Sequence, residues 1–221
     1  MAAAAVKLYG PLTSPAVARA LACILEKKIP YELVPVDMRK GEHKKPSYLA
    51  MQPFGQVPAF QDGNLTLFES RAIVRYIAQK YEAQGTIGMW GENLTERALI
   101  DQWMEVESQS FNPPSLALLF QIAVAPMMGL TPNQEEINKN EEKLGKVLDV
   151  YDQRLSQSKY LAGDEFSIAD LSHLPNMEYI VNKTGKSELV RNRKNVNGWW
   201  EDISGRPSWK EVAELSKPVK K

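Results

Sequence analysis

The chain has 221 residues, with 27 lysine and arginine side chains balanced by 27 aspartate and glutamate side chains. The length allows one large domain or two smaller ones, and a net charge of zero excludes recognition of nucleic acids or acidic membranes through bulk charge. The one cysteine, Cys23, excludes an internal disulfide. The longest apolar stretch, residues 116–128, is too short for a membrane span, and residues 1–7 do not resemble a signal peptide. We therefore expect a soluble, cytosolic protein without nucleic-acid or membrane partners.

The first part of the chain alternates short strands with helices. Residues 5–9 predict a strand that ends at a Gly-Pro pair. Ser14 then has the character of a helix N-cap, with Pro15 at the first helical position, and apolar spacing continues the helix to about Lys28. A second strand follows over residues 31–36. This order predicts a parallel βαβ unit with a right-handed crossover.

Four further elements complete the predicted N-terminal domain. A short helix is expected near residues 45–49, and two apolar runs at 56–60 and 65–68 flank an Asp-Gly-Asn turn. A helix follows over residues 70–81, with Ser70 as its expected N-cap. The predicted order is βαβ-α-ββα, an α/β arrangement.

Residues 83–92 contain three glycines and no clear periodicity, which predicts a linker. We therefore expect one domain over residues 1–82 and an all-α domain over residues 93–221. Two apolar stripes indicate helices in the second domain. They consist of Leu99, Trp103 and Val106, and of Leu144, Leu148, Tyr151 and Leu155.

Prolines and capping residues indicate where the helices of the second domain start, break or bend. An Asn-Pro-Pro run at residues 112–114 predicts a break or kink. Ser167 and Asp170 form a capping box that starts a further helix, in which Pro175 predicts a bend. His173 on this helix is interpreted as a core or capping residue. Because it lies far from His43 in sequence and neither has a cysteine neighbour, no metal site is expected.

Ser14 is the first candidate for chemistry, because its hydroxyl lies where a strand ends and a helix begins. The start of a helix favours anions through its partial positive charge and free N–H groups. A free thiol, with a pKa near about 8.5, is mostly protonated at neutral pH, so a hydrogen bond from Ser14 would favour the reactive thiolate. Read alone, the Ser-Pro pair equally fits a simple helix cap.

The segment Pro53–Pro58 (PFGQVP) is the second candidate. A cis Val57–Pro58 bond at the start of an edge strand would free the main chain of Val57 to pair with an extended peptide. The Gln56 amide could add a further contact. A trans turn is the simple alternative.

Two further groups of polar residues could bind charged ends of a ligand. Glu69 could face an ammonium group, while Ser70 and the start of its helix could bind a carboxylate. His43 and Lys44, in a charged run, could bind a second carboxylate. An ordinary capped helix and a solvated charge run are the alternatives.

In combination these motifs resemble the glutathione transferases, most closely the plant phi class. The resemblance rests on residues 52–59 (QPFGQVPA) and 67–73 (LFESRAI), supported by residues 41–45 (GEHKK), 160–163 (YLAG) and 206–209 (RPSW). It covers nearly the whole chain in the right order. The family implies a thioredoxin-like N-terminal domain, an all-helical C-terminal domain and a homodimer.

The resemblance also implies the reaction and its residues. Glutathione is the cosubstrate, with no metal or prosthetic group, and its thiolate attacks hydrophobic electrophiles, with peroxide reduction as a side activity. Ser14 would stabilise the thiolate, and Phe54 would insert into the partner subunit. The implied glutathione site comprises His43, Lys44, Gln56, Val57, the cis-proline Pro58, Glu69 and Ser70. By position, we expect the electrophile site at Leu12, Met38, Phe111, Phe120 and Ile122.

Three alternatives remain open at this stage. Thr13 precedes Ser14 and could share its role, whereas Tyr9, the tyrosine at the end of the first strand, ranks below both. A non-catalytic carrier of flavonoids or other hydrophobic ligands is the main alternative to an enzyme. A thiol-disulfide reductase is disfavoured because Cys23 lies too deep in the first helix. Tasks in detoxification, stress response and pigment transport are all compatible with the sequence, as are several hydrophobic electrophiles.

Overall fold

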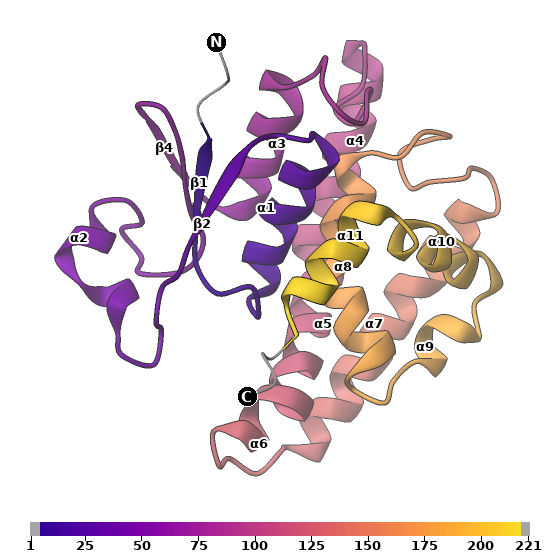
Figure 1. Ribbon diagram of the computed structural model, residues 1–221. Helices are drawn as coiled ribbons and strands as arrows, with labels where there is room; N and C mark the ends of the chain where they lie inside the picture. Colours follow the sequence, from indigo (N-terminus) through magenta and orange to yellow (C-terminus); the bar gives the residue numbers. More distant parts are fainter. Residues whose placement is uncertain (1–4, 218–221) are drawn as a thin grey trace. The chain divides into compact units, whose positions relative to one another are not determined.

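The computed structural model describes residues 5–217, which form two compact units (Figure 1). Unit 1 comprises residues 5–90 and 207–217 of the described chain, and unit 2 comprises Gly91–Arg206. No helix among the described residues is both long enough and apolar enough to cross a membrane.

Unit 1 is built on a four-stranded sheet with the order β2-β1-β3-β4. The strands are β1 (Val6–Tyr9), β2 (Tyr31–Val34), β3 (Ala59–Asp62) and β4 (Leu65–Phe68). β1 pairs with β2 in parallel, and the β1–β3 and β3–β4 pairs are antiparallel. Because α1 (Pro15–Glu26) connects the two parallel strands, the predicted βαβ unit is confirmed.

Two helices cover one side of this sheet. Figure 1 shows α1 and α3 (Ser70–Lys80) on that side, whereas the short α2 (Pro46–Leu49) lies on the other. A 3₁₀ turn at Glu42–Lys44, not predicted, precedes α2. The two helices pack through apolar side chains, which drives their association with the sheet. The fully buried members include Val17, Leu21, Ile24, Ile73, Val74 and Ile77.

Two predicted boundaries in unit 1 were wrong. β3 begins at Ala59 rather than at Gln56, because Pro58 has no N–H to donate to a ladder. The N-cap of α3 is Glu69, whereas Ser70, the predicted N-cap, is the first helical residue. Its hydroxyl accepts a hydrogen bond from another helix instead of capping its own.

The last described helix, α11 (Pro207–Leu215), belongs to unit 1, although we expected a C-terminal domain over residues 93–221. Its Ser208 hydroxyl donates a hydrogen bond to the buried carboxylate of Glu26 at the end of α1. The same carboxylate accepts a hydrogen bond from Thr86 in the expected linker, and Lys27 Nζ donates to the Thr86 carbonyl at 2.7 Å. Paired buried polar groups thus join α11 and residues 83–90 to α1.

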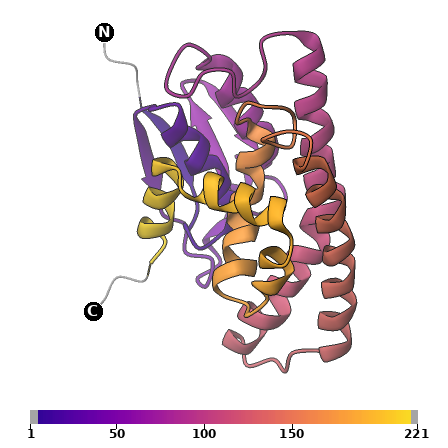
Figure 2. The same cartoon turned by 90° about the vertical axis from the view of Figure 1, so that its right-hand side faces the viewer.

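Unit 2 contains no strand among its described residues, as the prediction of an all-α domain requires. Figure 2 allows its helices to be followed from the magenta α4 to the orange α8. The helices are α4 (Leu94–Val106), α5 (Asn112–Leu119), α6 (Ala125–Met127), α7 (Gln134–Leu155), α8 (Ile168–Asn182), α9 (Glu188–Arg191) and α10 (Lys194–Ser204).

The Asn-Pro-Pro run at residues 112–114, where we expected a break or kink, directly follows an interruption of the α-helix. A π-helical turn at Glu107–Phe111 joins α4 to α5, in which Pro113 and Pro114 occupy the first turn. A second π turn, Phe120–Val124, precedes Pro126 in the same way. A proline lacks an N–H and clashes with the carbonyl four residues earlier, so a wider turn accommodates it without ending the helix.

The core of unit 2 confirms one predicted stripe and corrects the other. Leu144, Leu148 and Tyr151 are fully buried, as expected for α7. On α4, by contrast, Leu99 is 39% exposed, and the buried face is formed by Ile100, Trp103 and Met104. The predicted capping box at Ser167 and Asp170 is present, and Ser167 is the N-cap of α8.

Candidate functional site

Ser14 holds its predicted position at the N-terminus of α1, with Pro15 at the first helical position. Its main chain is engaged, because its N–H donates to the Pro11 carbonyl and its carbonyl accepts from Ala18 N–H, both at 3.0 Å. The hydroxyl, in contrast, caps no helical N–H and has no hydrogen-bond partner among residues 5–217. The half-buried hydroxyl is therefore free to bond an anion placed at the helix start.

Tyr9 and Thr13 are the two alternatives to Ser14, and the hydroxyl of Tyr9 is engaged. The Tyr9 hydroxyl donates to Gln61 Oε1 at 2.6 Å, across the paired strands β1 and β3. Thr13 is exposed and already takes part in an interaction within the structure. The engagement of the Tyr9 hydroxyl favours Ser14 over Tyr9 as the thiolate partner.

The Val57–Pro58 peptide bond is cis, as the sequence motif suggested. The Val57 main chain makes no hydrogen bond to any part of the chain that the structure describes. Its side chain lies against Gly10, at which a Cβ atom would come within 3.1 Å of Val57 Cβ. Gly10 also requires a φ of +140°, a conformation that favours glycine. This close approach brings the Val57 segment to the loop that leads into Ser14.

The segment before Val57 is fixed by hydrogen bonds to its main chain. Gln56 N–H donates to Gln52 Oε1 at 3.1 Å, and the Tyr48 hydroxyl donates to the Gln56 carbonyl at 2.8 Å. The Gln56 side chain remains exposed, so its amide can contact a bound molecule.

The charged run lies against the same segment. Lys44 Nζ donates to the Phe54 carbonyl at 3.1 Å, and a Cβ atom at Gly55 would come within 2.7 Å of the Lys44 side chain. His43 is half-buried, and its Nδ1 is buried without a partner among the described residues. A buried ring nitrogen normally has a hydrogen-bond partner, so His43 has capacity left for a ligand group.

Glu69 and Ser70 form the start of α3. Glu69 is exposed and adopts a φ of +66°, a sterically unfavourable conformation for a residue with a Cβ atom, of the kind that concentrates at functional sites. Ser70 is 4% exposed, and its hydroxyl accepts a hydrogen bond from Arg19 Nη1 at 2.8 Å. Arg19 was not singled out from the sequence, although a charged residue within the apolar pattern of residues 17–25 was a visible signal.

The expected electrophile residues fall in both units. In unit 1, Leu12 is half-buried and Met38 is 41% exposed. In unit 2, Phe120 is 41% exposed and Ile122 half-buried, whereas Phe111 is fully buried, with its ring 4.7 Å from that of His173. This burial indicates that Phe111 serves the core of unit 2, so we do not retain it as a ligand contact.

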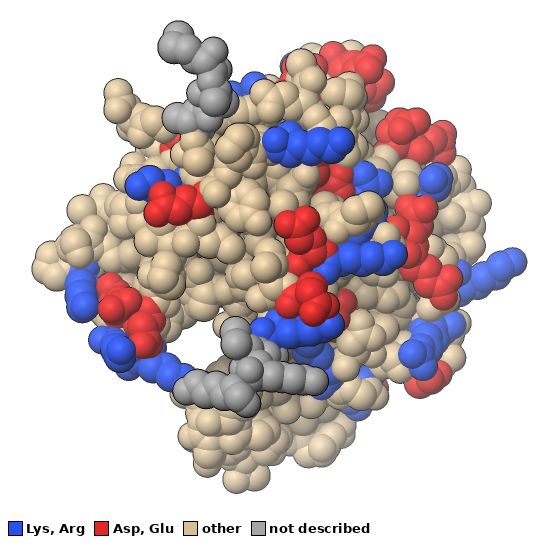
Figure 3. Space-filling model, in the orientation of Figure 1, with Lys and Arg blue, Asp and Glu red and all other residues tan. Residues whose placement is uncertain are grey.

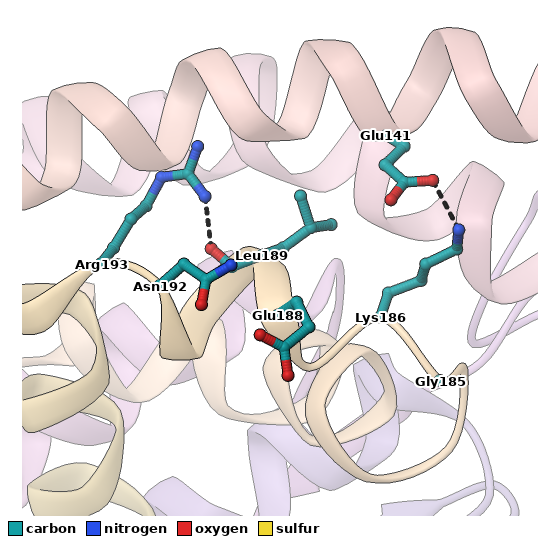
Figure 4. Close-up of a pocket in the computed structure, with 7 residues that line it drawn as sticks. All are labelled: Glu141, Gly185, Lys186, Glu188, Leu189, Asn192 and Arg193. Atoms are coloured by element: carbon teal, nitrogen blue, oxygen red, sulfur yellow. Dashed lines mark hydrogen bonds and ion pairs between the residues drawn. The ribbon is translucent and has the colours of Figure 1, made fainter.

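Unit 2 also contains a pocket that none of these residues lines. It has a volume of about 350 Å³ and lies between α7 and the segment around α9. Figure 4 shows the contacts of two of its basic side chains, with Lys186 on Glu141 at 2.5 Å and Arg193 on the Leu189 carbonyl at 2.6 Å. We assign no ligand to this pocket.

The charged groups of the described residues bear on two further kinds of site, a nucleic-acid-binding surface and a metal site. Figure 3 shows basic and acidic side chains interspersed on the face drawn, without a continuous basic area. Within residues 5–217, no group of three or more histidine, cysteine or carboxylate side chains could hold a metal ion. Cys23 is buried, as predicted, and burial raises the pKa of its thiol, which keeps it protonated.

Comparison with known families finds one N-terminal and one C-terminal family domain in the chain. Residues 4–79 match the glutathione S-transferase N-terminal domain, and residues 111–207 match the glutathione S-transferase C-terminal domain. Glutathione S-transferase F9 of Arabidopsis thaliana is 49% identical over 96% of this chain and 99% of its own length. A glutathione S-transferase of Hyoscyamus muticus is also 49% identical, over 94% of this chain and 97% of its own.

The similar solved structures belong to the same family as these relatives. Glutathione transferase F2 from Populus trichocarpa is 59% identical with a TM-score of 0.94, covering 96% of this chain and 98% of its own. Glutathione S-transferase I from mais, solved with an atrazine glutathione conjugate, is 41% identical with a TM-score of 0.91, covering 98% of this chain and 100% of its own. The similarity favours the enzyme over the non-catalytic carrier. The chain belongs to the glutathione S-transferase family, in its plant phi class, and is a transferase that takes glutathione as its cosubstrate.

Proposed function

We propose that Ser14 donates a hydrogen bond to the sulfur of bound glutathione and stabilises its thiolate for attack on hydrophobic electrophiles. The observation that carries this proposal is the hydroxyl of Ser14, which has no partner among residues 5–217 although it lies at the positive end of α1. The thiolate forms a bond to an electrophilic carbon, and a leaving group departs with its electron pair or a double bond is saturated. The enzyme accelerates the reaction by holding both reactants together and by stabilising anionic charge.

The proposed glutathione site has one region for each part of the tripeptide. The cysteinyl main chain pairs with the free N–H and carbonyl of Val57, beside Pro58, as an added strand would. At the γ-glutamyl end, Glu69 faces the ammonium group, while Ser70 and the start of α3 bind the carboxylate. The remaining contacts, at the glycine carboxylate and the peptide amides, are assigned to His43, Lys44 and Gln56.

The partners are also part of the proposal. The atrazine conjugate bound to the mais relative supports an apolar aromatic electrophile, which Leu12, Met38, Phe120 and Ile122 would contact. We further propose a cytosolic homodimer in which Phe54 inserts into the partner subunit. Phe54 is 66% exposed in the described chain, which supports such a contact. Reduction of organic peroxides would be a side activity of the same thiolate.

Substitution of Ser14 by alanine tests the catalytic assignment. A hydrogen bond to a charged group contributes roughly 1.5–3 kcal/mol, so kcat/KM for glutathione is expected to fall by about 10- to 100-fold. The measurement is the absorbance change on conjugation of glutathione to a chloronitrobenzene. Thr13→Ala is the matched control and should retain activity. Full activity in Ser14→Ala with a loss in Thr13→Ala would move the assignment to Thr13.

A further inference from the structure

Glu26 is a buried carboxylate at the last position of α1, where it is only 6% exposed. The C-terminal end of a helix carries partial negative charge, so this position is unfavourable for an anion. Removal of the charge from water is unfavourable as well, unless the carboxylate is well bonded. The place of Glu26 in the fold is therefore explained by what it binds rather than by the helix to which it belongs.

Two hydroxyl groups from distant segments donate to this carboxylate, that of Thr86 and that of Ser208 at the start of α11. The Thr86 main chain is bound at the same place, because its N–H donates to the Glu26 carbonyl at 2.9 Å and its carbonyl accepts from Lys27 Nζ at 2.7 Å. A Cβ atom at Gly85 would lie 2.0 Å from the Glu26 carbonyl oxygen, so this segment fits closely against the end of α1. Glu26 thus holds the start of α11 at a point that is itself bonded on several sides.

From this point α11 packs along α1 and runs in the opposite direction (Figure 1). Ser208 lies at the end of α1, whereas the Ser216 hydroxyl, directly after α11, lies 3.3 Å from the Leu12 carbonyl oxygen. The same hydroxyl lies 2.7 Å from the Val212 carbonyl oxygen, so its proton is shared between the two carbonyls. Trp209 and Val212 are buried, so apolar packing as well as hydrogen bonds keeps α11 in place. The helix therefore reaches from the end of α1 back to the loop that precedes α1.

The Leu12 carbonyl belongs to the loop between β1 and Ser14. The N–H groups of Gly10 and Ser14 hold the two ends of this loop, through hydrogen bonds of 3.0 Å each. The Ser216 hydroxyl reaches the part between them. The position of α11 is thus transmitted to Leu12, which is a proposed contact of the electrophile.

We infer that α11 is a brace for the electrophile site: Glu26 is the positioning residue that fixes its start, and Ser216 transmits its position to Leu12. The inference rests on the electrophile site proposed above. The proposed glutathione contacts lie on other segments of unit 1, at residues 43–44, 56–58 and 69–70. Release of α11 should therefore raise KM for the electrophile, while KM for glutathione stays nearly unchanged.

The kinetic test compares Glu26→Ala, Glu26→Gln, Ser216→Ala and the double variant Glu26→Ala/Ser216→Ala. KM for a chloronitrobenzene is measured at saturating glutathione, and KM for glutathione at a saturating chloronitrobenzene. We expect KM for the chloronitrobenzene to rise by roughly three- to tenfold in Glu26→Ala and by roughly two- to fivefold in Ser216→Ala, with KM for glutathione within about twofold. Glu26→Gln keeps an acceptor oxygen and should give a smaller rise. The double variant should resemble Glu26→Ala, because both substitutions act through the position of α11.

Hydrogen exchange gives a second readout, which a general loss of stability would not reproduce. In Glu26→Ala the amides of residues 10–14 and 207–217 should exchange faster than in the unsubstituted enzyme, while those of β3 and α3 keep their rates. Asp62→Asn is the matched control, since the Asp62 carboxylate also accepts several hydrogen bonds within unit 1, from α3 and Tyr81 rather than from α11. It should leave both KM values and exchange at residues 10–14 unchanged.

An unchanged KM for the chloronitrobenzene in both Glu26→Ala and Ser216→Ala, or an equal rise in Asp62→Asn, would overturn the inference. So would unchanged exchange at residues 10–14 in Glu26→Ala. If Glu26→Ala does not fold, Glu26→Gln and Ser216→Ala decide by the same measurements. Leu12→Ala separates the inference from the proposed function, because an unchanged KM for the chloronitrobenzene in that variant would contradict the proposed electrophile contact. Exchange at residues 10–14 would then decide whether α11 acts as a brace.

Discussion

At the scale of single residues, Ser14 differs from its neighbours in having an unused hydroxyl, and this has a consequence for the pH profile. A hydrogen bond to the thiolate lowers the thiol pKa of bound glutathione. Removal of that bond in Ser14→Ala should raise the pKa by about one unit or more, since one unit corresponds to about 1.36 kcal/mol. The pH at which kcat/KM for glutathione is half-maximal should rise accordingly, as measured between about pH 5.5 and 9.5. Thr13→Ala should keep the original profile, and an unshifted profile in Ser14→Ala would contradict the role.

Asp62, at the end of β3, gives a second residue-scale prediction, on stability. Its carboxylate accepts hydrogen bonds from Lys80 Nζ and the Tyr81 hydroxyl, both at 2.7 Å, and from the Tyr76 hydroxyl at 3.1 Å. Burial alone would raise the pKa of Asp62, but these hydrogen bonds outweigh it and hold the pKa below its ordinary value. The pKa of Asp62 is thus lower in the folded protein than in the unfolded chain, where it is about 3.9. The ionised carboxylate therefore stabilises the fold above that pH, and this stabilisation is lost as the pH falls through the folded-state pKa.

Asp62→Asn should therefore lower the free energy of unfolding by roughly 1–3 kcal/mol at pH 7, with a smaller difference below about pH 4. Denaturant unfolding of both proteins across this range is the measurement. A difference that stays constant down to the acid limit would show that the charge of Asp62 is not the cause.

More of the site residues than of their contacts could be predicted from the sequence. Ser14, Val57 and Pro58 could be singled out because local rules on helix starts and X-Pro bonds apply to neighbours in the chain. The contacts of Arg19 and Gly10 could not be predicted, because each residue meets a segment that lies far away in sequence. Only the fold shows that Gly10 meets Val57 and that Arg19 meets Ser70.

At the scale of elements, the start of α8 depends on one buried carboxylate. Asp170 accepts hydrogen bonds from the N–H groups of Leu161 and Ser167, from the Ser167 hydroxyl at 2.9 Å, and from Trp199 Nε1 at 3.0 Å. Ser167→Ala should lower the free energy of unfolding by about 1–2 kcal/mol, whereas Asp170→Ala should lower it by roughly 3–5 kcal/mol, because it leaves several buried donors unpaired.

Denaturant unfolding at neutral pH measures both changes. Asn133→Ala is the matched control, since Asn133 caps α7 at an exposed position by accepting from the N–H groups of Glu135 and Glu136. We expect a loss of about 1 kcal/mol there. An Asp170→Ala effect no larger than this control would mean that Asp170 is an ordinary cap.

Periodicity predicted the existence of the elements well and their details less well. The α7 stripe was right because its apolar positions recur over a long helix. The stripe predicted for α4 placed Leu99 in the core, where the structure has Ile100. Both residues are apolar, and only packing decides which of them is buried. The proline rule located the irregularity expected at residues 112–114 but not its form, which is a π turn directly before them.

At the scale of the whole molecule, the chain returns to its first unit after completing the second. Glu26 and Ser208 are 182 positions apart, yet they share a buried hydrogen bond. Composition and periodicity describe α11 as one more amphipathic helix after a helical domain, and neither tells which core it joins. The predicted single cut at residues 83–92 therefore could not represent a unit formed from both ends of the described chain.

The proposed homodimer gives a prediction at this scale. Phe54 is 66% exposed and touches the Phe68 ring edge-on, with 6.0 Å between ring centroids, so most of its apolar surface is available to a partner. Burial of a phenylalanine side chain in an interface stabilises the dimer by roughly 1.5–3 kcal/mol. Each 1.4 kcal/mol or so changes the dissociation constant by a factor of ten. Phe54→Ala should therefore raise the dimer dissociation constant by about 10- to 100-fold, as measured by sedimentation over a range of concentrations. Ile87→Ala, at a site 59% exposed in the same unit, is the control and should leave it unchanged. Equal dissociation constants in Phe54→Ala and the unsubstituted protein would place the contact elsewhere.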